Sequence, residues 1–204
     1  MEDEEQLRGY AEVRGVPILR EASHKKLASL VEKYKPKHIL EIGTAIGYSG
    51  ITMLENCDGD LVTIELMQKS SELAKQNFAN AGLENRVTVI NGDAKFVLTE
   101  MICDDANLGK FDFVFLDGAK GQYIKMLESI LMLLAPDGIL VADNVMFRGY
   151  IDGSVKAPRR FKTIVKRLQE FIKTCYESDE LKVIELDKSE DGMLICKKEK
   201  LWEG

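Results

Sequence analysis

The chain has 204 residues, which is enough for one domain of ordinary size and too short for two. With 45% apolar residues it can bury a sizeable core, and its net charge of −6 excludes a uniformly basic nucleic-acid coat but not a local basic patch. The counts of 16 Gly, 4 Pro and 4 Cys exclude collagen-like, disordered and disulfide-scaffold proteins. We therefore expect a single domain over residues 1–204.

The sequence carries no sign of export or membrane insertion. No apolar run approaches the roughly 20 residues that a membrane span needs, and the start Met1-Glu2-Asp3 is acidic, unlike a signal peptide. The four cysteines are scattered without a Cys-x-x-Cys pair, a pattern typical of reduced thiols. We expect a cytoplasmic protein with neither disulfides nor a zinc site.

Short apolar runs alternate with amphipathic stretches along most of the chain. The runs are close to continuously hydrophobic, as expected of strands buried on both faces; they lie at 38–42, 61–65, 87–91, 111–117 and 139–142. Helical spacing of apolar residues follows in the stretches 27–34, 73–81 and 126–134, with Gly82 as a cap and a turn at 136–138. Strand–helix alternation of this kind predicts a three-layer α/β/α domain.

The two ends of the chain differ from this central pattern. Residues 1–37 form a helical region before the core, which we expect to span 38–204. The tail predicts a helix near 158–174 and two strands at 181–186 and 193–196, which form a closing hairpin at one edge of the sheet.

Polar residues follow the predicted strands, at the carboxyl ends where open parallel sheets bind ligands. The first strand leads into a turn at 41–49, which runs from Glu41 to Ser49, and Gly43 and Gly47 allow a ligand to approach its backbone closely. The spacing is neither that of a dinucleotide-binding loop nor that of a P-loop. Alone, the turn is equally consistent with an ordinary strand–helix connection.

The next two strand ends favour a nucleoside cofactor. Glu65 lies 22 residues after Gly43, where a carboxylate can accept hydrogen bonds from a ribose diol. The third strand ends at 91–94, which includes Asp93 and Ala94 and suits an adenine edge. An isolated Glu65 would more often be a solvated strand-end residue, but the three strand ends together indicate a cofactor site.

The fourth and fifth strands add carboxylate and amide oxygens. Asp117, Asp143 and Asn144 follow neighbouring strands, and such hard oxygen ligands suit Mg²⁺ or a similar divalent cation. The alternative for Asp143-Asn144 is a helix cap or a turn, which these residues also favour.

A basic segment lies near the C-terminus. Residues 156–173 contain seven basic side chains and one acid, so the window carries +6 and the rest of the chain −12. An apolar stripe of Phe161, Ile164, Val165, Leu168 and Ile172 leaves Arg159, Lys162, Lys166 and Lys173 largely on the opposite face. Such a face can contact phosphates, and the alternative is a solvated amphipathic helix.

Together these motifs resemble the cation-dependent O-methyltransferases of the catechol and caffeoyl-coenzyme A type, from Val16-Pro17-Ile18-Leu19 to the C-terminal strands. The resemblance implies a Rossmann-like fold with a mostly parallel seven-stranded sheet, and a homodimer. It implies S-adenosylmethionine contacts at Leu19, Ser49, Glu65, Asp93, Ala94 and Asp117, to which the turn adds Glu41, Gly43 and Gly47. It also implies Mg²⁺, Mn²⁺ or Ca²⁺ held by Asp117, Asp143 and Asn144, with Lys120 beside the reacting oxygen as base or as oxyanion stabiliser.

A narrower likeness is to the bacterial branch that methylates 5-hydroxyuridine in tRNA. It is carried by the segments 117–123, 143–149, 158–167 and 191–193. It implies that the enzyme converts wobble 5-hydroxyuridine to 5-methoxyuridine, with tRNA contacts at Arg148, Arg159, Arg160, Lys166 and Arg167. Two alternatives stay open: methylation of small catechol or hydroxycinnamoyl-type substrates, and a noncatalytic nucleotide-binding regulator.

Overall fold

The computed structural model describes residues 7–9, 13 and 18–200. Val16 and Pro17, which the family resemblance included, lie outside the described residues. The chain divides into two compact units, which we call the N-terminal unit (1–94) and the C-terminal unit (95–204).

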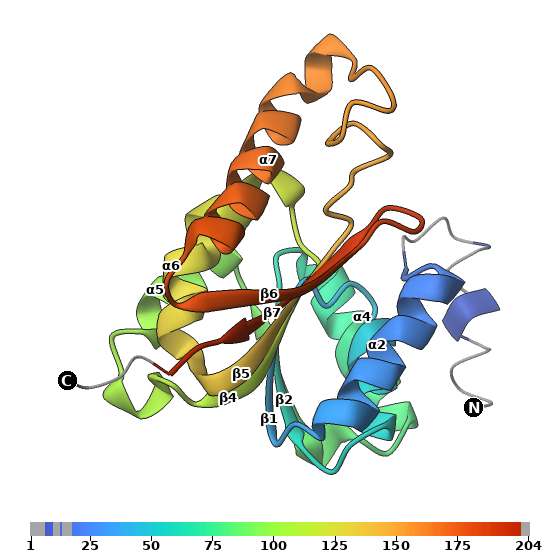
Figure 1. The fold of residues 1–204 in the computed structure, drawn as a ribbon. Helices are drawn as coiled ribbons and strands as arrows, with labels where there is room; N and C mark the ends of the chain where they lie inside the picture. Colours follow the sequence, from blue (N-terminus) through green and yellow to red (C-terminus); the bar gives the residue numbers. More distant parts are fainter. Residues whose placement is uncertain (1–6, 10–12, 14–17, 201–204) are drawn as a thin grey trace. The chain divides into compact units, whose positions relative to one another are not determined.

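The N-terminal unit is built on three parallel strands (Figure 1). Strand β2 pairs with β1 on one side and with β3 on the other, so that Glu41 lies beside Thr63 and Glu65 beside Asn91. The elements in chain order are α2 (Glu21–Tyr34), β1 (His38–Ile42), α3 (Tyr48–Glu55), β2 (Asp60–Glu65), α4 (Gln68–Asn80), η1 (Glu84–Arg86) and β3 (Val87–Asn91). The predicted runs 38–42 and 87–91 coincide with β1 and β3.

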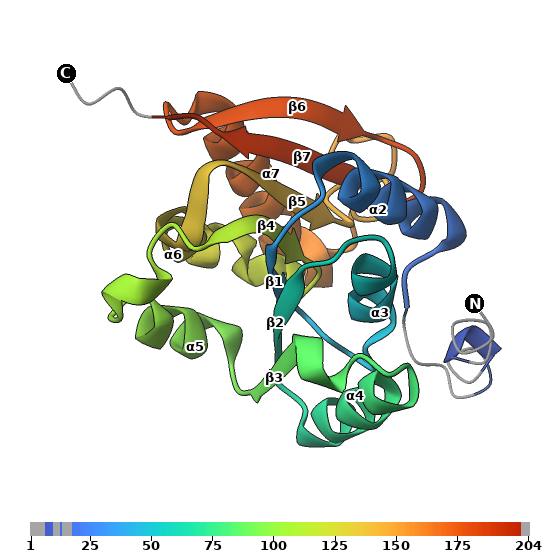
Figure 2. The same ribbon diagram turned by 90° about the horizontal axis from the view of Figure 1, so that it is seen from below.

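Helices cover these strands on one side, where Figure 2 shows α3 and α4 next to each other. Helix α3 contacts β2, α4 contacts β2 and β3, and α2 packs on α3. Helix α4 ends at Asn80, and Gly82 caps it as predicted, with the N–H of Leu83 donating to the carbonyl of Phe78 at 2.8 Å. One expectation is wrong: β3 is not buried on both faces, since its residues are half-buried or exposed. Its partner in this unit is β2, and the helix that contacts it is α4.

The C-terminal unit holds four strands in the order β4-β5-β7-β6. Strands β4 and β5 are parallel, and β7 is antiparallel to both β5 and β6, which confirms the predicted closing hairpin. The elements are α5 (Ala94–Met101), which starts at the unit boundary, η2 (Asp105–Asn107), β4 (Phe111–Leu116), η3 (Lys120–Gln122), α6 (Tyr123–Leu133), β5 (Leu134–Asp143), η4 (Arg159–Phe161), α7 (Lys162–Glu177), β6 (Leu181–Asp187) and β7 (Met193–Lys198).

Helix α7 lies alongside α6 and packs against β6 (Figure 1). Its buried residues are Val165, Leu168, Phe171 and Cys175. The predicted stripe was therefore right at Val165 and Leu168, whereas Phe161, Ile164 and Ile172 are half-buried. Phe161 lies before the helix, where its ring stacks on Tyr150, with the ring centroids 5.9 Å apart.

Two buried thiols meet in this unit. The side chains of Cys175 on α7 and Cys196 on β7 share a hydrogen bond, and this contact together with burial raises the pKa of the Cys175 thiol. All four cysteines lie in the described part of the chain and are free, as the sequence predicted.

Strand β5 is longer than predicted. The turn-forming segment 136–138 does not separate helix from strand, because β5 already begins at Leu134 and the segment forms a bulge opposite Phe111–Phe113. Asp137 adopts a φ of 64° in this bulge, and Lys197 and Lys200 hold its carboxylate at 2.8 and 3.0 Å. Among the described residues, no helix is both long and apolar enough to cross a membrane.

Candidate active site

In the N-terminal unit, the turn between β1 and α3 has the predicted tight geometry. Gly43 has a φ of 104° and Gly47 a φ of 89°, both in the region that favours glycine. The N–H groups of Gly43 and Thr44 donate to the carbonyl of Ile64, and Asn77 on α4 donates to the carbonyl of Ile46 at 2.8 Å. These contacts fix the turn at the carboxyl ends of β1 and β2, with the start of α3 directly after it.

Glu41 is a fully buried carboxylate at the centre of a hydroxyl network. Ser49 donates to its Oε1, and Thr63 donates to its Oε2 at 2.6 Å. Thr44 and Thr63 also share a hydrogen bond of 2.5 Å. The network links β1, β2 and α3 behind the turn, so it gives Glu41 and Ser49 a structural function whether or not either one also contacts a cofactor.

Glu65 is held in place by two backbone amides. Its Oε2 accepts a hydrogen bond from Ala45 N–H and its Oε1 one from Met67 N–H, each at 2.8 Å. A carboxylate offers about four lone-pair positions, so each oxygen retains capacity for a ligand hydroxyl. The side chain is 9% exposed, and the residues that follow it, Leu66 and Met67, are 64% and 60% exposed. An oriented acid beside exposed apolar side chains suits a ribose and its base.

The end of β3 is tied to the same place. The Asn91 side chain donates to the carbonyls of Glu65 and Leu66, and Gly92 N–H donates to the carbonyl of Glu65. Asp93 is exposed directly beyond this link. The structure thus brings the ends of β2 and β3 together as the sequence predicted, while Leu19 is buried just before α2.

In the C-terminal unit, two carboxylates follow neighbouring parallel strands. The β4–β5 register ends with Leu116 opposite Ala142, so Asp117 and Asp143 are the next residues on each strand. Paired strands lie about 4.8 Å apart, which places the two acids side by side. Asp143 is 2% exposed, and the Asn144 amide donates to its Oδ2 at 3.1 Å. Asn144 has a φ of 56°, so the chain turns at this residue.

Lys120 lies against Asp117. The Lys120 ammonium donates to Asp117 Oδ1 at 2.9 Å, and the two side chains are 22% and 24% exposed. Burial raises the pKa of Asp117, and the charge and hydrogen bond of Lys120 lower it only in part. The pair therefore combines a carboxylate that is costly to ionise with the cation that offsets its charge.

The residues present fit a divalent cation. Two carboxylates and one amide, all at the ends of β4 and β5, are the hard oxygen donors that Mg²⁺ prefers. A cation would also relieve the repulsion between two adjacent acids in a partly buried site. The three predicted ligands are thus neighbours, from two strand ends of one unit.

Sequence reasoning missed Tyr123, the first residue of α6. Its hydroxyl lies 3.1 Å from the carbonyl oxygen of Leu116 and 3.2 Å from that of Asp143. Burial and the charges of Asp117 and Asp143 raise the pKa of this phenol well above its usual value, so it stays a hydrogen-bond donor. The available signal was an aromatic residue with a polar tip three positions after Lys120, but periodicity does not reveal which carbonyl such a tip reaches.

The β6–β7 turn supports the loop that follows the acids. The Asp191 carboxylate accepts a hydrogen bond from Arg148 N–H at 3.0 Å, and its carbonyl accepts one from Met146 N–H at 2.8 Å. The Gly192 carbonyl accepts a third from Val145 N–H at 3.0 Å. The segments 143–149 and 191–193, which the sequence singled out separately, therefore form one structure.

The basic residues divide into two groups. Arg148, Arg159, Arg160 and Lys166 are exposed, and the Arg160 guanidinium lies 4.7 Å from the centre of the Phe161 ring. Arg167 is half-buried instead, and its Nη1 donates to the carbonyl of Gly121 at 3.3 Å. The structure thus places Arg167 against the segment that carries Lys120, apart from the exposed group.

Comparisons with known proteins agree with this geometry. Residues 14–199 match the sequence profile of a family described as O-methyltransferase. A catechol O-methyltransferase of Niastella koreensis is 33% identical over 149 residues, which cover 69% of this chain and 66% of that protein. A structure from Staphylococcus aureus, named as a candidate caffeoyl-CoA O-methyltransferase, has a TM-score of 0.84 at 31% identity and covers 96% of this chain and 91% of its own. The O-methyltransferase TomG from Streptomyces achromogenes, solved in complex with S-adenosylmethionine, has a TM-score of 0.84 at 25% identity, with coverages of 98% and 91%.

Proposed function

Because this chain belongs to the O-methyltransferase family, we propose that it methylates the 5-hydroxyl group of 5-hydroxyuridine in tRNA, with a divalent cation as cofactor. The family and the solved relatives make it an S-adenosylmethionine-dependent methyltransferase with the predicted Rossmann-like fold. The tRNA acceptor, the cation, a cytoplasmic location and the pairing of two copies are our proposals beyond that.

The N-terminal unit supports the binding of the methyl donor. Glu65 is oriented by two backbone amides and keeps lone pairs for the ribose hydroxyls. Gly43, at the start of the turn, is half-buried with a positive φ and would let a ligand approach its backbone, and Asp93 lies exposed beyond β3 for the adenine edge. These residues bind and orient the donor, and none of them has to take part in proton transfer.

The C-terminal unit supports the activation of the acceptor. Asp117, Asp143 and Asn144 would hold the cation, which when bound lowers the pKa of a chelated hydroxyl and fixes two adjacent acceptor oxygens. In 5-hydroxyuridine these oxygens would be the 5-hydroxyl and the neighbouring 4-carbonyl. Lys120 Nζ, 2.9 Å from Asp117, lies where it can receive the hydroxyl proton or stabilise the oxyanion as an ammonium.

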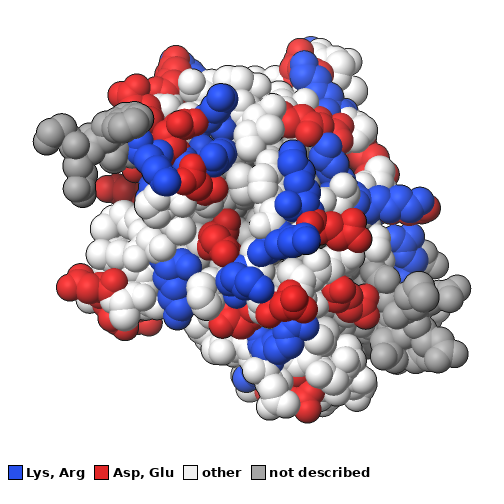
Figure 3. Space-filling model, turned by 60° about the horizontal axis from the view of Figure 1, so that its bottom comes forward, with Lys and Arg blue, Asp and Glu red and all other residues white. Residues whose placement is uncertain are grey.

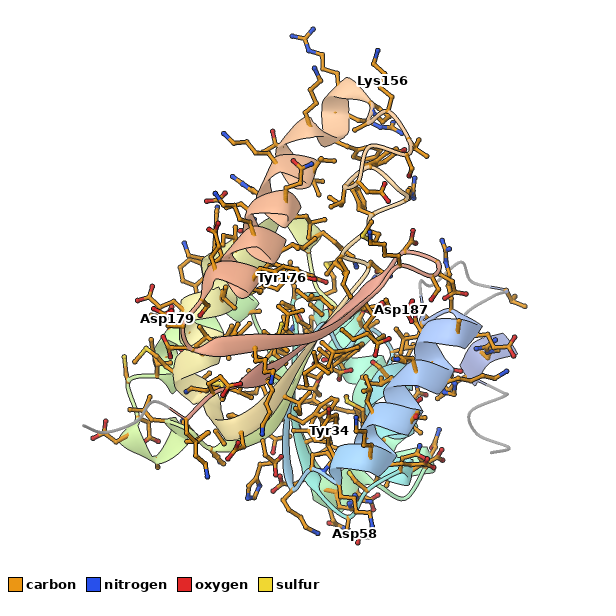
Figure 4. The ribbon with its side chains drawn as sticks, in the orientation of Figure 1. Tyr34, Asp58, Lys156, Tyr176, Asp179 and Asp187 are labelled. Carbon is orange, nitrogen blue, oxygen red and sulfur yellow. The ribbon has the colours of Figure 1, made fainter. Side chains whose placement is uncertain are left out.

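The exposed basic row on η4 and α7 is the observation that favours RNA over a small acceptor. Five basic side chains between Arg159 and Lys173 are exposed, while Val165, Leu168 and Phe171 are buried. Figure 4 shows Lys156 at the end of the unit where α7 begins. On the face drawn in Figure 3, by contrast, blue and red side chains are interspersed. A basic row on an acidic protein suits local phosphate contacts.

Nucleoside analysis of tRNA tests the proposed function. In a strain that lacks this protein, mass spectrometry should find 5-hydroxyuridine in place of 5-methoxyuridine, and the intact gene should restore the methylated nucleoside. Unchanged 5-methoxyuridine in a strain without a second such enzyme would contradict the tRNA assignment.

Reactions with purified protein test the proposed cation and the proposed acceptor separately. Transfer of labelled methyl groups to tRNA that contains 5-hydroxyuridine should stop in excess EDTA and return with Mg²⁺. Full activity in the chelator would contradict the cation. The catechol O-methyltransferase among the relatives makes a free catechol the second acceptor to test, and transfer to the catechol without transfer to tRNA would favour that second candidate.

A further inference from the structure

Tyr123 connects the two strand ends that carry the acids. Its side chain is fully buried, and its hydroxyl lies 3.1 Å from Leu116 O and 3.2 Å from Asp143 O. A phenol has a single hydrogen, so the two carbonyls share one donor. The Leu116 carbonyl belongs to the peptide that leads into Asp117, and the other carbonyl is that of Asp143 itself.

This contact lies where the pairing of β4 with β5 stops. The β4–β5 register ends at the pair Leu116–Ala142, so this ladder does not hold Asp117 next to Asp143, although β7 still pairs with Asp143 through Met193. Beyond this pair the Tyr123 hydroxyl links the two strands, because it contacts a backbone carbonyl on each of them. The distance between the two acids therefore depends on a side chain from α6.

Packing fixes the direction of the hydroxyl. The Tyr123 ring meets Phe171 on α7 edge to face, with the ring centroids 5.5 Å apart and the planes at 72°. Both side chains are buried, which leaves the ring little freedom to rotate away. Lys120, which contacts the Asp117 carboxylate, lies three residues before Tyr123. One short segment therefore contacts the ends of both strands.

We propose that Tyr123 is a positioning residue whose hydroxyl sets the spacing of Asp117 and Asp143 and thereby the affinity of the site for a divalent cation. The inference rests on the proposed function, because it concerns the same cation. Tyr123 contacts the backbone of the two acids and does not touch the reacting atoms. Groups that orient cation ligands typically change affinity by about 10- to 100-fold when they are removed.

The test measures cation binding without any turnover. Tyr123→Phe keeps the ring and its contact with Phe171 but removes the hydroxyl. Binding of Mn²⁺, followed by the electron paramagnetic resonance signal of the free ion, should weaken by roughly 10- to 100-fold. Calorimetry should find S-adenosylmethionine affinity within about twofold of wild type, since Glu65 and its amides are untouched.

Two further variants separate this role from general stability. Tyr176→Phe removes the hydroxyl of a tyrosine on α7 that is 56% exposed, and Mn²⁺ affinity should stay at the wild-type value. Phe171→Leu loosens the packing but keeps the Tyr123 hydroxyl, so it should lower the melting temperature at least as much as Tyr123→Phe while weakening Mn²⁺ binding less.

The possible outcomes distinguish a failure of this inference from a failure of the proposed function. If wild-type protein binds no Mn²⁺, the proposed cation is wrong. If wild type binds Mn²⁺ and Tyr123→Phe binds it equally well, the positioning role is wrong and the proposed function stands. If Phe171→Leu weakens Mn²⁺ binding as much as Tyr123→Phe does, packing and not the hydroxyl sets the affinity, which also overturns the inference.

Discussion

Arg167 and Gly121 join α7 to the segment that carries Lys120: the Arg167 guanidinium donates to the Gly121 carbonyl oxygen at 3.3 Å. The neighbouring basic residues Arg159, Arg160 and Lys166 are exposed instead. The basic segment formed by η4 and α7 thus contains one arginine with a structural contact and a row of exposed cations. Substitution of the exposed cations should therefore affect RNA binding, whereas substitution of Arg167 should affect the active site.

The first prediction follows from that separation. Replacing Arg159, Arg160 and Lys166 together with Ala should weaken tRNA binding and reduce the slope of log Kd against log salt by about one for each phosphate that the variant no longer neutralises. Methylation of a free catechol should not change. Arg167→Ala should instead lower activity on both acceptors, because it releases the Lys120 segment. Filter binding at several salt concentrations and both methylation assays provide the measurements.

A triple variant of three exposed lysines elsewhere, Lys33, Lys75 and Lys110 to Ala, is the matched control, because it removes the same charge. It should leave the tRNA affinity close to wild type. An equal loss in the control would mean that net charge, and not the exposed basic row on η4 and α7, governs RNA binding.

Glu65→Gln should weaken S-adenosylmethionine binding. The amide keeps the shape of the carboxylate but loses its charge, and one of its two ends can no longer accept from Ala45 or Met67. Hydrogen bonds to a charged group are worth about 1.5–3 kcal/mol, so the Kd should rise roughly 10- to 100-fold. Calorimetry measures this, with Glu72→Gln on the exposed face of α4 as the control. Unchanged affinity in Glu65→Gln would remove this residue from the donor site.

Lys120→Met should make stability depend more strongly on pH in metal-free protein. The pKa of Asp117 is raised on folding, so its favourable contribution is complete below the unfolded pKa and is lost as pH rises through the folded pKa. Lys120 lowers the pKa of Asp117, and its removal raises that pKa further. The variant should therefore match wild type near pH 4 and become less stable by on the order of 1 kcal/mol at pH 7.

Urea unfolding in EDTA across this pH range measures the difference. Lys125→Met, which removes an exposed lysine from the same helix as Tyr123, is the control and should show no pH-dependent loss. A Lys120→Met protein whose deficit stayed constant from pH 4 to 7 would show that the ion pair with Asp117 contributes nothing.

Gly192→Ala should destabilise the loop behind Asp143 more than Gly82→Ala destabilises the end of α4. Both glycines have positive φ, 79° and 69°. A Cβ on Gly192 would lie 2.2 Å from Met146 Cγ, whereas one on Gly82 would meet nothing within 4 Å. We expect about 1 kcal/mol for Gly82→Ala from backbone strain alone and a loss larger by about 1–3 kcal/mol for Gly192→Ala. Thermal unfolding of the two variants compares them, and equal losses would exclude the clash.

Local patterns predicted most of the elements. Strand β1 was predicted residue for residue, because its continuous apolar run ends at the glycine turn. The start of β5 was not, because residues 136–138 have the composition of a turn. Asp137 instead forms a bulge that Lys197 and Lys200 hold from outside the strand. No short window of sequence contains that ion pairing.

The candidate site, too, could be predicted from the sequence only in part. The acids could be predicted because they follow strands, and the topology of a parallel sheet then brings them together. The supports of the site could not be predicted, because the Tyr123 hydroxyl and the Asp191 carboxylate act on backbone groups 20 and 43 residues away in sequence. Glu41 was assigned to ligand binding from its place beside the glycine turn, whereas Ser49 and Thr63 engage it inside the fold.

The buried thiols of Cys175 and Cys196 allow local opening of the C-terminal unit to be measured. Both are buried between a helix and a strand, while Cys103 is exposed. A thiol-labelling reagent should modify Cys103 at once and reach Cys175 and Cys196 only when the packing around them opens. Their labelling rate then reports how often the hydrophobic interior of this half of the protein opens, with no need to introduce a cysteine.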